Sequence, residues 1–166
     1  MGGLAFINSG LFDVAATKPD AGVVKWVLET TREKSIRSRS KDITVPSLDD
    51  ESLVETGLRN YDQMCVGCHG APGIPQSVIG EGLNPEPPDL SEEAAFMAPA
   101  ELFWITQNGI KMTGMPAFGP THSDEELWSM VAFMQKLPDL SPEKYKAMKE
   151  DLEKIPQEQN HNDHAH

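Results

Sequence analysis

The stretch "MCVGCHGAPG", residues 64–73, carries both cysteines of this 166-residue chain and a histidine beside them. Cys65 and Cys68 are separated by two residues, and His69 follows Cys68 directly. Three kinds of chemistry use such a spacing: a disulfide or redox pair, half of a zinc site, and an attachment point for haem. The rest of the sequence decides among them.

The chain lacks the further ligands and the context that two of these alternatives need. A zinc site requires about four ligands, and there is no third cysteine. The adjacent Cys68 and His69 would also have difficulty in reaching one small ion. A thioredoxin-like redox pair follows a strand in an alternating strand–helix pattern, which the sequence does not show. In haem attachment, two thiols on one turn form thioether bonds to the vinyl groups, and the next imidazole binds the iron. The motif therefore predicts one covalently bound haem c.

A second iron ligand is expected downstream, and methionine is the usual partner of histidine in c-type haem. The sequence after the motif offers Met97, Met112, Met115, Met130 and Met134. Met130 and Met134 fall in an amphipathic segment near the C-terminus, where core packing is the simplest role.

Met112 and Met115 lie instead in a loop bounded by glycine and proline, where a side chain can be aimed at a ligand. Pro116 follows Met115 and fixes the backbone there. We predict His69 and Met115 as the metal ligands. Met112 is the chief rival, both methionines could instead be soft filler in the core, and His122 would give bis-histidine ligation.

Apolar periodicity and capping residues predict an all-α fold. We expect helices over residues 20–36, 50–64, 98–109, 123–137 and 141–155, and we interpret the basic segment "REKSIRSRSK" (32–41) as a solvated connector. Ser123 and Glu126 form a capping box, and Ser141 with Pro142 begins the last helix. Residues 70–90 and 110–122 are shaped loops because glycine and proline punctuate them.

These motifs in order resemble those of a class I monohaem cytochrome c over residues 50–138. The resemblance rests on "CVGCHG" after a helix with Gly57 and Tyr61, followed by "PPDL", "NGIKMTGMPAFG" and "SDEELWSMVAFMQKL". It implies a cytochrome c fold, with helices around one covalently bound haem. In this family the first and last helices cross, so Gly57 and Tyr61 should meet Trp128 and either Val131 or Phe133.

The resemblance also assigns a role to the proline-rich segment "EPPDL". We expect Pro88 and Leu90, with Pro87, to lie on the proximal side of the haem, and a carbonyl of this loop to accept the Nδ1 proton of His69. The cofactor-binding residues are thus expected to be Cys65, Cys68, His69, Met115, Pro88 and Leu90. Trp104 either packs in the core or reaches the haem.

We divide the chain into four segments. Residues 1–47 are an N-terminal extension with a helix, 48–138 the cytochrome c domain, 139–155 a C-terminal helix, and 156–166 a flexible tail containing histidines. The apolar start "GGLAFINSG" is too short to cross a bilayer. It is either the remnant of a membrane anchor or a buried strand or loop. His161, His164 and His166 suggest a weak copper or nickel site.

Charge is distributed unevenly along the chain. Residues 1–41 carry a net charge of +3 and the remainder carries −15, which gives the chain its net charge of −12. Such an acidic body repels nucleic acid and favours redox partners with basic docking surfaces, unless the acidity serves only solubility.

Together these features predict an electron carrier and not an enzyme. Its task would be one-electron transfer between extracytoplasmic or membrane redox partners, with Gly67 and Ala71 at the docking surface. The alternatives are a five-coordinate haem sensor or peroxidase-like protein, and the haem subunit of a larger oxidoreductase docked through residues 1–47. We expect a periplasmic location, with anchorage to the inner membrane.

Overall fold

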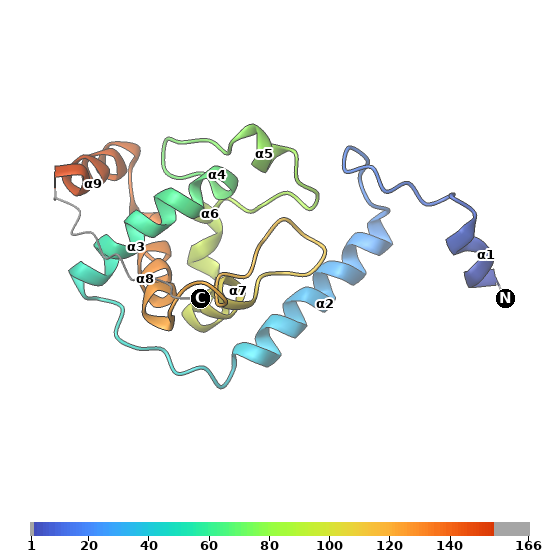
Figure 1. Cartoon of the computed structure of the whole chain (residues 1–166), viewed down its shortest axis with the longest axis horizontal. Coiled ribbons are helices and arrows are strands. Elements are labelled where there is room, and N and C mark those ends of the chain that lie inside the picture. Colours follow the sequence, from blue (N-terminus) through green and yellow to red (C-terminus); the bar gives the residue numbers. More distant parts are fainter. Residues whose placement is uncertain (1, 155–166) are drawn as a thin grey trace, which may run out of the picture.

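Helices account for all the regular structure in residues 2–154, the part of the chain that the computed structural model describes (Figure 1). In chain order they are α1 (Gly2–Asn8), α2 (Gly22–Ser40), α3 (Glu51–Met64), α4 (Val66–His69), α5 (Val78–Glu81), α6 (Leu90–Glu93), the 3-10 turn η1 (Ala94–Phe96), α7 (Pro99–Asn108), α8 (Asp124–Met134), η2 (Leu137–Asp139) and α9 (Pro142–Lys154). No strand occurs in this range, so the all-α prediction is confirmed.

The closest helix–helix contact is made where α3 crosses α8. A Cβ atom at Gly57 would overlap the backbone oxygen of Ser129 and lie 2.9 Å from the Cβ of Phe133. The rings of Tyr61 and Phe133 pack beside this point with their centroids 5.4 Å apart. Glycine is therefore required here by close approach of the two backbones, as expected. Trp128 was expected at this crossing, but its ring stacks on that of Phe103 of α7, with the ring centroids 4.1 Å apart.

The core lies between α3, α7, α8 and α9. Its most deeply buried side chains are Leu58, Tyr61, Leu127, Met130, Val131, Phe133, Leu137 and Tyr145. Met130 and Met134 both belong to this core, which confirms their predicted role as packing residues. The predicted capping box begins α8: Ser123 Oγ accepts from the Glu126 N–H, and the Glu126 carboxylate accepts from the Ser123 N–H at 2.8 Å.

The C-terminal helix α9 packs on the outside of α3. Tyr145 is 1% exposed, and its hydroxyl donates to Asp62 Oδ1 at 3.1 Å. Lys149 Nζ pairs with the same carboxylate oxygen at 2.6 Å. Burial first, and then the Asp62 charge, raise the pKa of Tyr145 above its usual value, so this hydroxyl stays protonated as a donor. At the start of α9, Pro142 contacts the loop after the cysteine motif at Gly73.

The segment interpreted as a solvated connector is helical, and that prediction was wrong. α2 continues to Ser40, and Ile36 and Ser40, one turn apart, are buried. α2 packs against α7 along this stripe, and Arg37 Nε lies 3.5 Å from Glu101 Oε1. Ile36 is the buried apolar residue of this stripe, and the charged side chains around it extend into solvent.

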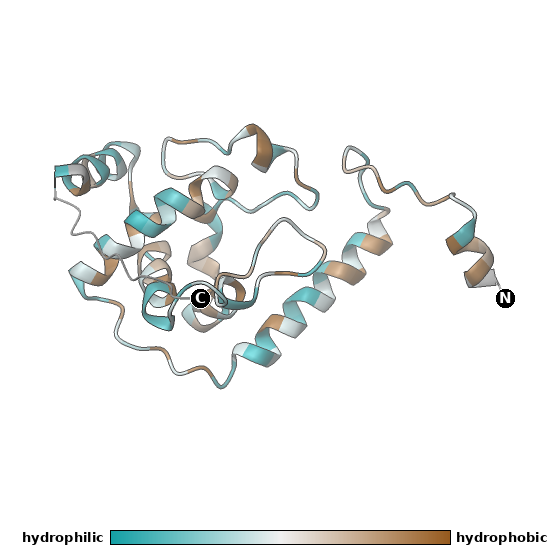
Figure 2. Cartoon of the chain, viewed as in Figure 1, coloured by the Kyte–Doolittle hydropathy of each residue, from teal (hydrophilic) through white to brown (hydrophobic). Residues whose placement is uncertain are grey.

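The N-terminal arm, residues 3–28, carries apolar side chains that the rest of the described chain leaves uncovered. In Figure 2 the ribbon is coloured hydrophobic at several places on α1, on the following segment and on the first turns of α2. The exposed side chains are Leu4, Phe6, Ile7, Leu11, Phe12, Val14, Val23, Trp26, Val27 and Leu28. The start of the chain is thus an exposed helix, and the expectation of a buried strand or loop was wrong. None of the helices in residues 2–154 combines the length and the apolar composition that a membrane span needs.

Candidate functional site

The cysteine motif forms a single helical turn at the end of α3. Cys65 caps the end of α3 and begins α4, and its carbonyl accepts from the Cys68 N–H at 3.0 Å and the His69 N–H at 2.9 Å. The two thiols are not joined in a disulfide. Burial, reinforced by the neighbouring Cys68, raises the pKa of Cys65 to about 12, so its thiol stays protonated at neutral pH.

His69 is held in one tautomer by the proline-rich loop. The ring is 9% exposed, and its Nδ1 lies 2.8 Å from the Pro88 carbonyl oxygen. A carbonyl can only accept, so Nδ1 carries the proton and Nε2 keeps a lone pair. Burial lowers the pKa of His69, opposed by the Pro88 hydrogen bond and the Asp89 charge. A neutral imidazole with a free Nε2 is the form that binds metal.

The loop between α4 and α6 wraps around the motif. The Ser77 N–H donates to the Gly67 carbonyl at 3.0 Å, and a Cβ at Gly80 would lie 3.1 Å from the Cα of Cys68. Gln76 Nε2 donates to the Pro87 carbonyl at 2.8 Å. Leu90, the first residue of α6, is buried in the core at 6% exposure. The predicted residues Pro88 and Leu90 therefore both lie in the loop and helix that support His69.

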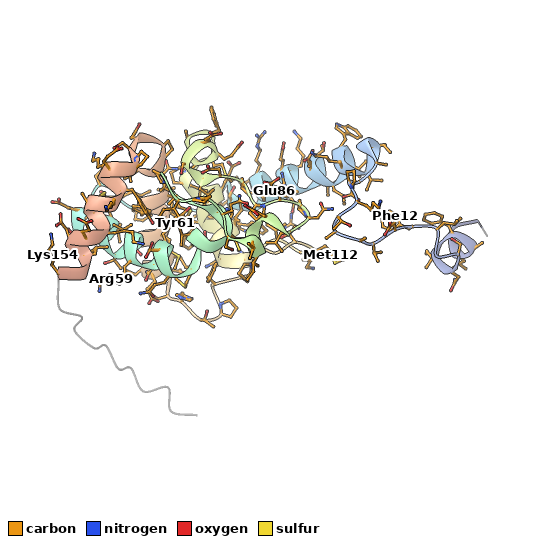
Figure 3. All side chains as sticks on the ribbon, turned by 90° about the horizontal axis from the view of Figure 1, so that it is seen from above. Phe12, Arg59, Tyr61, Glu86, Met112 and Lys154 are labelled. Carbon is orange, nitrogen blue, oxygen red and sulfur yellow. The ribbon has the colours of Figure 1, made fainter. Side chains whose placement is uncertain are left out.

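The two candidate methionines differ sharply in the loop after α7. Met115 is half-buried; its N–H donates to Thr113 Oγ1 at 3.1 Å, and its carbonyl accepts from the Ile110 N–H at 3.2 Å. Met112 is 97% exposed, has a backbone φ of 61°, and lies at the edge of the domain in Figure 3. The loop fixes the position of Met115 and leaves Met112 in solvent.

The loop that carries Met115 contacts the segment that leads to Pro88. A Cβ at Gly114, next to Met115, would lie only 2.5 Å from Cδ1 of Leu83. Leu83 begins the run that leads to Pro88 and thereby to His69. The structure thus joins Cys65, Cys68, His69 and Pro88 in one unit and places the Met115 loop against the segment that supports it.

This set of donors fits a c-type haem. Two thiols and a neutral imidazole project from one helical turn, and a thioether lies in a neighbouring loop of fixed shape. Val78 and Ile79 precede Gly80, which contacts Cys68, and their apolar side chains are 84% and 70% exposed. A zinc centre does not fit, since no three His, Cys, Asp or Glu side chains in residues 2–154 are grouped to hold a metal ion.

Several other expectations have different outcomes. Ala71 is buried at 6% exposure, so its predicted place at a docking surface is wrong, whereas Gly67 is exposed. His122 Nδ1 lies 2.9 Å from Thr121 Oγ1, and its ring meets Phe118 edge-on. Trp104 is half-buried. The tail histidines His161, His164 and His166 lie outside the described residues.

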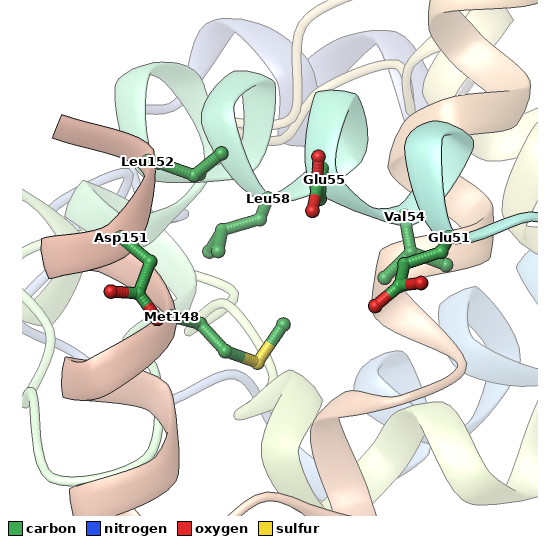
Figure 4. Close-up of a pocket in the computed structure, with 7 residues that line it drawn as sticks. All are labelled: Glu51, Val54, Glu55, Leu58, Met148, Asp151 and Leu152. Carbon is green, nitrogen blue, oxygen red and sulfur yellow. The ribbon is translucent and has the colours of Figure 1, made fainter. Parts of the chain in front are cut away.

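The supporting hydrogen bonds of Gln76 and Thr113 were not predicted from the sequence. Each is a polar residue inside a glycine- and proline-rich loop beside a predicted ligand, and that placement was the available signal. The hollow shown in Figure 4 is a separate feature between α3 and α9. It is lined by Glu51, Val54, Glu55, Leu58, Met148, Asp151 and Leu152, and it includes no residue of the motif.

Comparison with known proteins places this geometry in a family. A family model described as "Cytochrome C oxidase, cbb3-type, subunit III" matches residues 52–134, which is half of the chain. The matched range begins in α3, ends with α8 and contains both the cysteine motif and the Met115 loop. No curated protein matches the chain.

Proposed function

Since the chain belongs to the family of cbb3-type cytochrome c oxidase subunit III, a c-type cytochrome domain, we propose that it carries one electron at a time on a single haem c. The family itself implies haem-based electron transfer and covalent attachment of the haem. The observation that carries the proposal is the unit formed by the two thiols and His69, whose Nδ1 is held by Pro88 at 2.8 Å.

In this proposal Cys65 and Cys68 would form the two thioether bonds, and His69 Nε2 and Met115 Sδ would bind the iron. Pro88 holds the imidazole ring in place, and Leu90 anchors the loop that carries Pro88. When bound, the haem supplies a one-electron couple. With His69 and Met115 as its two ligands from the chain, the iron would offer no site to a substrate. Outer-sphere electron transfer is therefore favoured over catalysis.

Removing both thiols should abolish covalent haem attachment. We expect the full chain, produced in a host that matures c-type cytochromes, to give a c-type pyridine haemochrome with about one haem per chain. The Cys65→Ser/Cys68→Ser variant should keep no haem after acid–acetone extraction. Met112→Ala, a change on an exposed side chain, is the control and should retain haem fully.

A colourless wild-type product with two free thiols would contradict the proposed function. A high-spin ferric spectrum in a chain with covalent haem would contradict only the assignment of His69 and Met115 as the two ligands. It would indicate a sensor or peroxidase-like protein.

The charge distribution supports redox partners with basic docking surfaces. Exposed carboxylates of Glu81, Glu86 and Asp89 lie on the loop around the motif, beside the exposed Gly67. Complementary charge speeds encounter between partners that must also separate quickly.

The family description also favours a second candidate: a haem subunit held in a larger oxidoreductase.

We further propose that the N-terminal arm attaches the protein to the extracytoplasmic face of the inner membrane. Two observations support this: the exposed apolar side chains between Leu4 and Val14, and the net positive charge of residues 1–41, which include them. Apolar side chains that enter the interface and cations that meet anionic headgroups act together in such attachment. Covalent haem maturation in bacteria, which takes place outside the cytoplasm, supports the periplasmic location.

Serine at two arm positions should weaken membrane binding. In flotation with vesicles that contain anionic lipid, we expect Phe6→Ser/Phe12→Ser to reduce the bound fraction about tenfold or more, because each phenyl ring loses its burial in lipid. Phe96→Ser, at a phenylalanine that is 85% exposed on η1, is the matched control and should bind as wild type. Equal binding by all three proteins would contradict the attachment.

A further inference from the structure

Residues 85–88 of the proline-rich loop that supports His69 make few hydrogen bonds to the rest of the chain. Pro85, Pro87 and Pro88 have no backbone N–H to donate. Within the part of the chain described here, residues 85–88 take part in two hydrogen bonds. One joins the Pro88 carbonyl to His69, and the other joins the Pro87 carbonyl to Gln76 Nε2, each at 2.8 Å.

The two bonds act on neighbouring peptide groups. Gln76 holds the peptide between Pro87 and Pro88, and the carbonyl that His69 uses belongs to the next peptide. The pyrrolidine ring of Pro88 fixes φ between these two planes. ψ of Pro88 is then the one free dihedral between the two planes, so the first peptide fixes the axis about which the second carbonyl turns.

The Gln76 side chain is itself placed at a cost. Its Oε1 is buried and has no hydrogen-bond partner among the described residues. Turning the amide over would bring an oxygen against the Pro87 carbonyl, so the observed orientation is the only favourable one. Buried polar atoms without partners are rare in proteins, and an apolar residue would fill this space without the penalty. The donor to Pro87 is what glutamine adds.

We propose that Gln76 is a positioning residue that sets the hydrogen bond between His69 and Pro88, and through it the reduction potential of the haem. This inference rests on the proposed function of His69 as an iron ligand. A hydrogen bond from Nδ1 increases the electron donation of the imidazole to the metal, which stabilises the oxidised state. Losing Gln76 frees the loop, weakens that bond and raises the potential.

Gln76→Leu tests the proposal on the full chain. At a fixed ambient potential, we expect the ratio of reduced to oxidised protein to rise roughly threefold. The weak red absorption band that arises from charge transfer between the Met115 sulfur and the iron should be retained. The Nδ1 proton of His69, followed by NMR, should exchange with solvent about tenfold faster. Gln63→Leu makes the same chemical change at an exposed position on α3 and should alter neither quantity.

The proton-exchange measurement applies to the folded chain whether or not haem is bound. A wild type without haem therefore contradicts the proposed function, and the exchange rate still tests whether Gln76 sets the hydrogen bond between His69 and Pro88. An unchanged rate in Gln76→Leu, or equal changes in the two variants, would overturn the proposal. If Gln76→Leu fails to fold, Gln76→Asn is measured in its place. Its amide is one methylene too short to reach Pro87, so the same results are expected.

Discussion

We expect Met115→Ala to lose the weak red absorption band that arises from sulfur-to-iron charge transfer, and to lower the reduction potential. A thioether ligand favours the reduced state, so its removal stabilises the oxidised one. The expected drop is on the order of 0.1 V, a fraction of the roughly 0.8 V that axial ligands can span. Visible spectroscopy and a redox titration measure both changes.

Met112→Ala is the matched control, because it makes the same change three residues away. Its side chain is 97% exposed, whereas Met115 is half-buried and held by two backbone hydrogen bonds. We expect the control to keep the band and the potential of the wild type. The opposite pattern, with the band lost in Met112→Ala and kept in Met115→Ala, would show that the ligand is misassigned.

The largest expected loss of stability comes from one methyl group at Gly57. In Gly57→Ala the new Cβ would overlap the Ser129 backbone oxygen, and no side-chain rotation can relieve a clash with backbone. α3 and α8 must then separate at the centre of the core. We expect a loss of roughly 3 kcal/mol, equivalent to a fall in Tm of about 10 °C for a chain of this size.

Gly22→Ala is the control for this change. Gly22 is the first residue of α2, and a Cβ there meets no atom within 4 Å. Thermal unfolding followed by circular dichroism should show a Tm within about 2 °C of the wild type, because alanine is also the better helix former. If Gly57→Ala is as stable as this control, the close approach of α3 and α8 is not a feature of the protein in solution.

Local signals in the sequence predicted what depends on neighbouring residues. The capping box of Ser123 and Glu126, the helical turn of the cysteine motif and the cap at Ser141 each need contacts only three or four residues apart. The crossing at Gly57 was expected from the resemblance to a family. These features required no knowledge of how distant segments meet.

Features that depend on distant segments were missed or left open. The resemblance implied that a loop carbonyl accepts from His69, but the choice of Pro88 follows from the path of residues 83–88 in the structure. The docking of α2 rests on Ile36, a single apolar residue in a charged segment, so its periodicity was too weak to detect. The pairing of Trp128 with α3 was expected from the resemblance, and it was wrong because the indole ring stacks on Phe103 of α7.

The packing of α9 determines where this protein can be shortened. The family match ends at residue 134, yet Tyr145 is sealed inside and its hydroxyl is bonded to Asp62, seven residues from the histidine of the motif. A recombinant version trimmed to the matched range would leave Phe133 and the adjoining side of α3 open to water. Fusion partners and affinity tags are therefore better joined beyond residue 154 than at the apparent boundary of the domain.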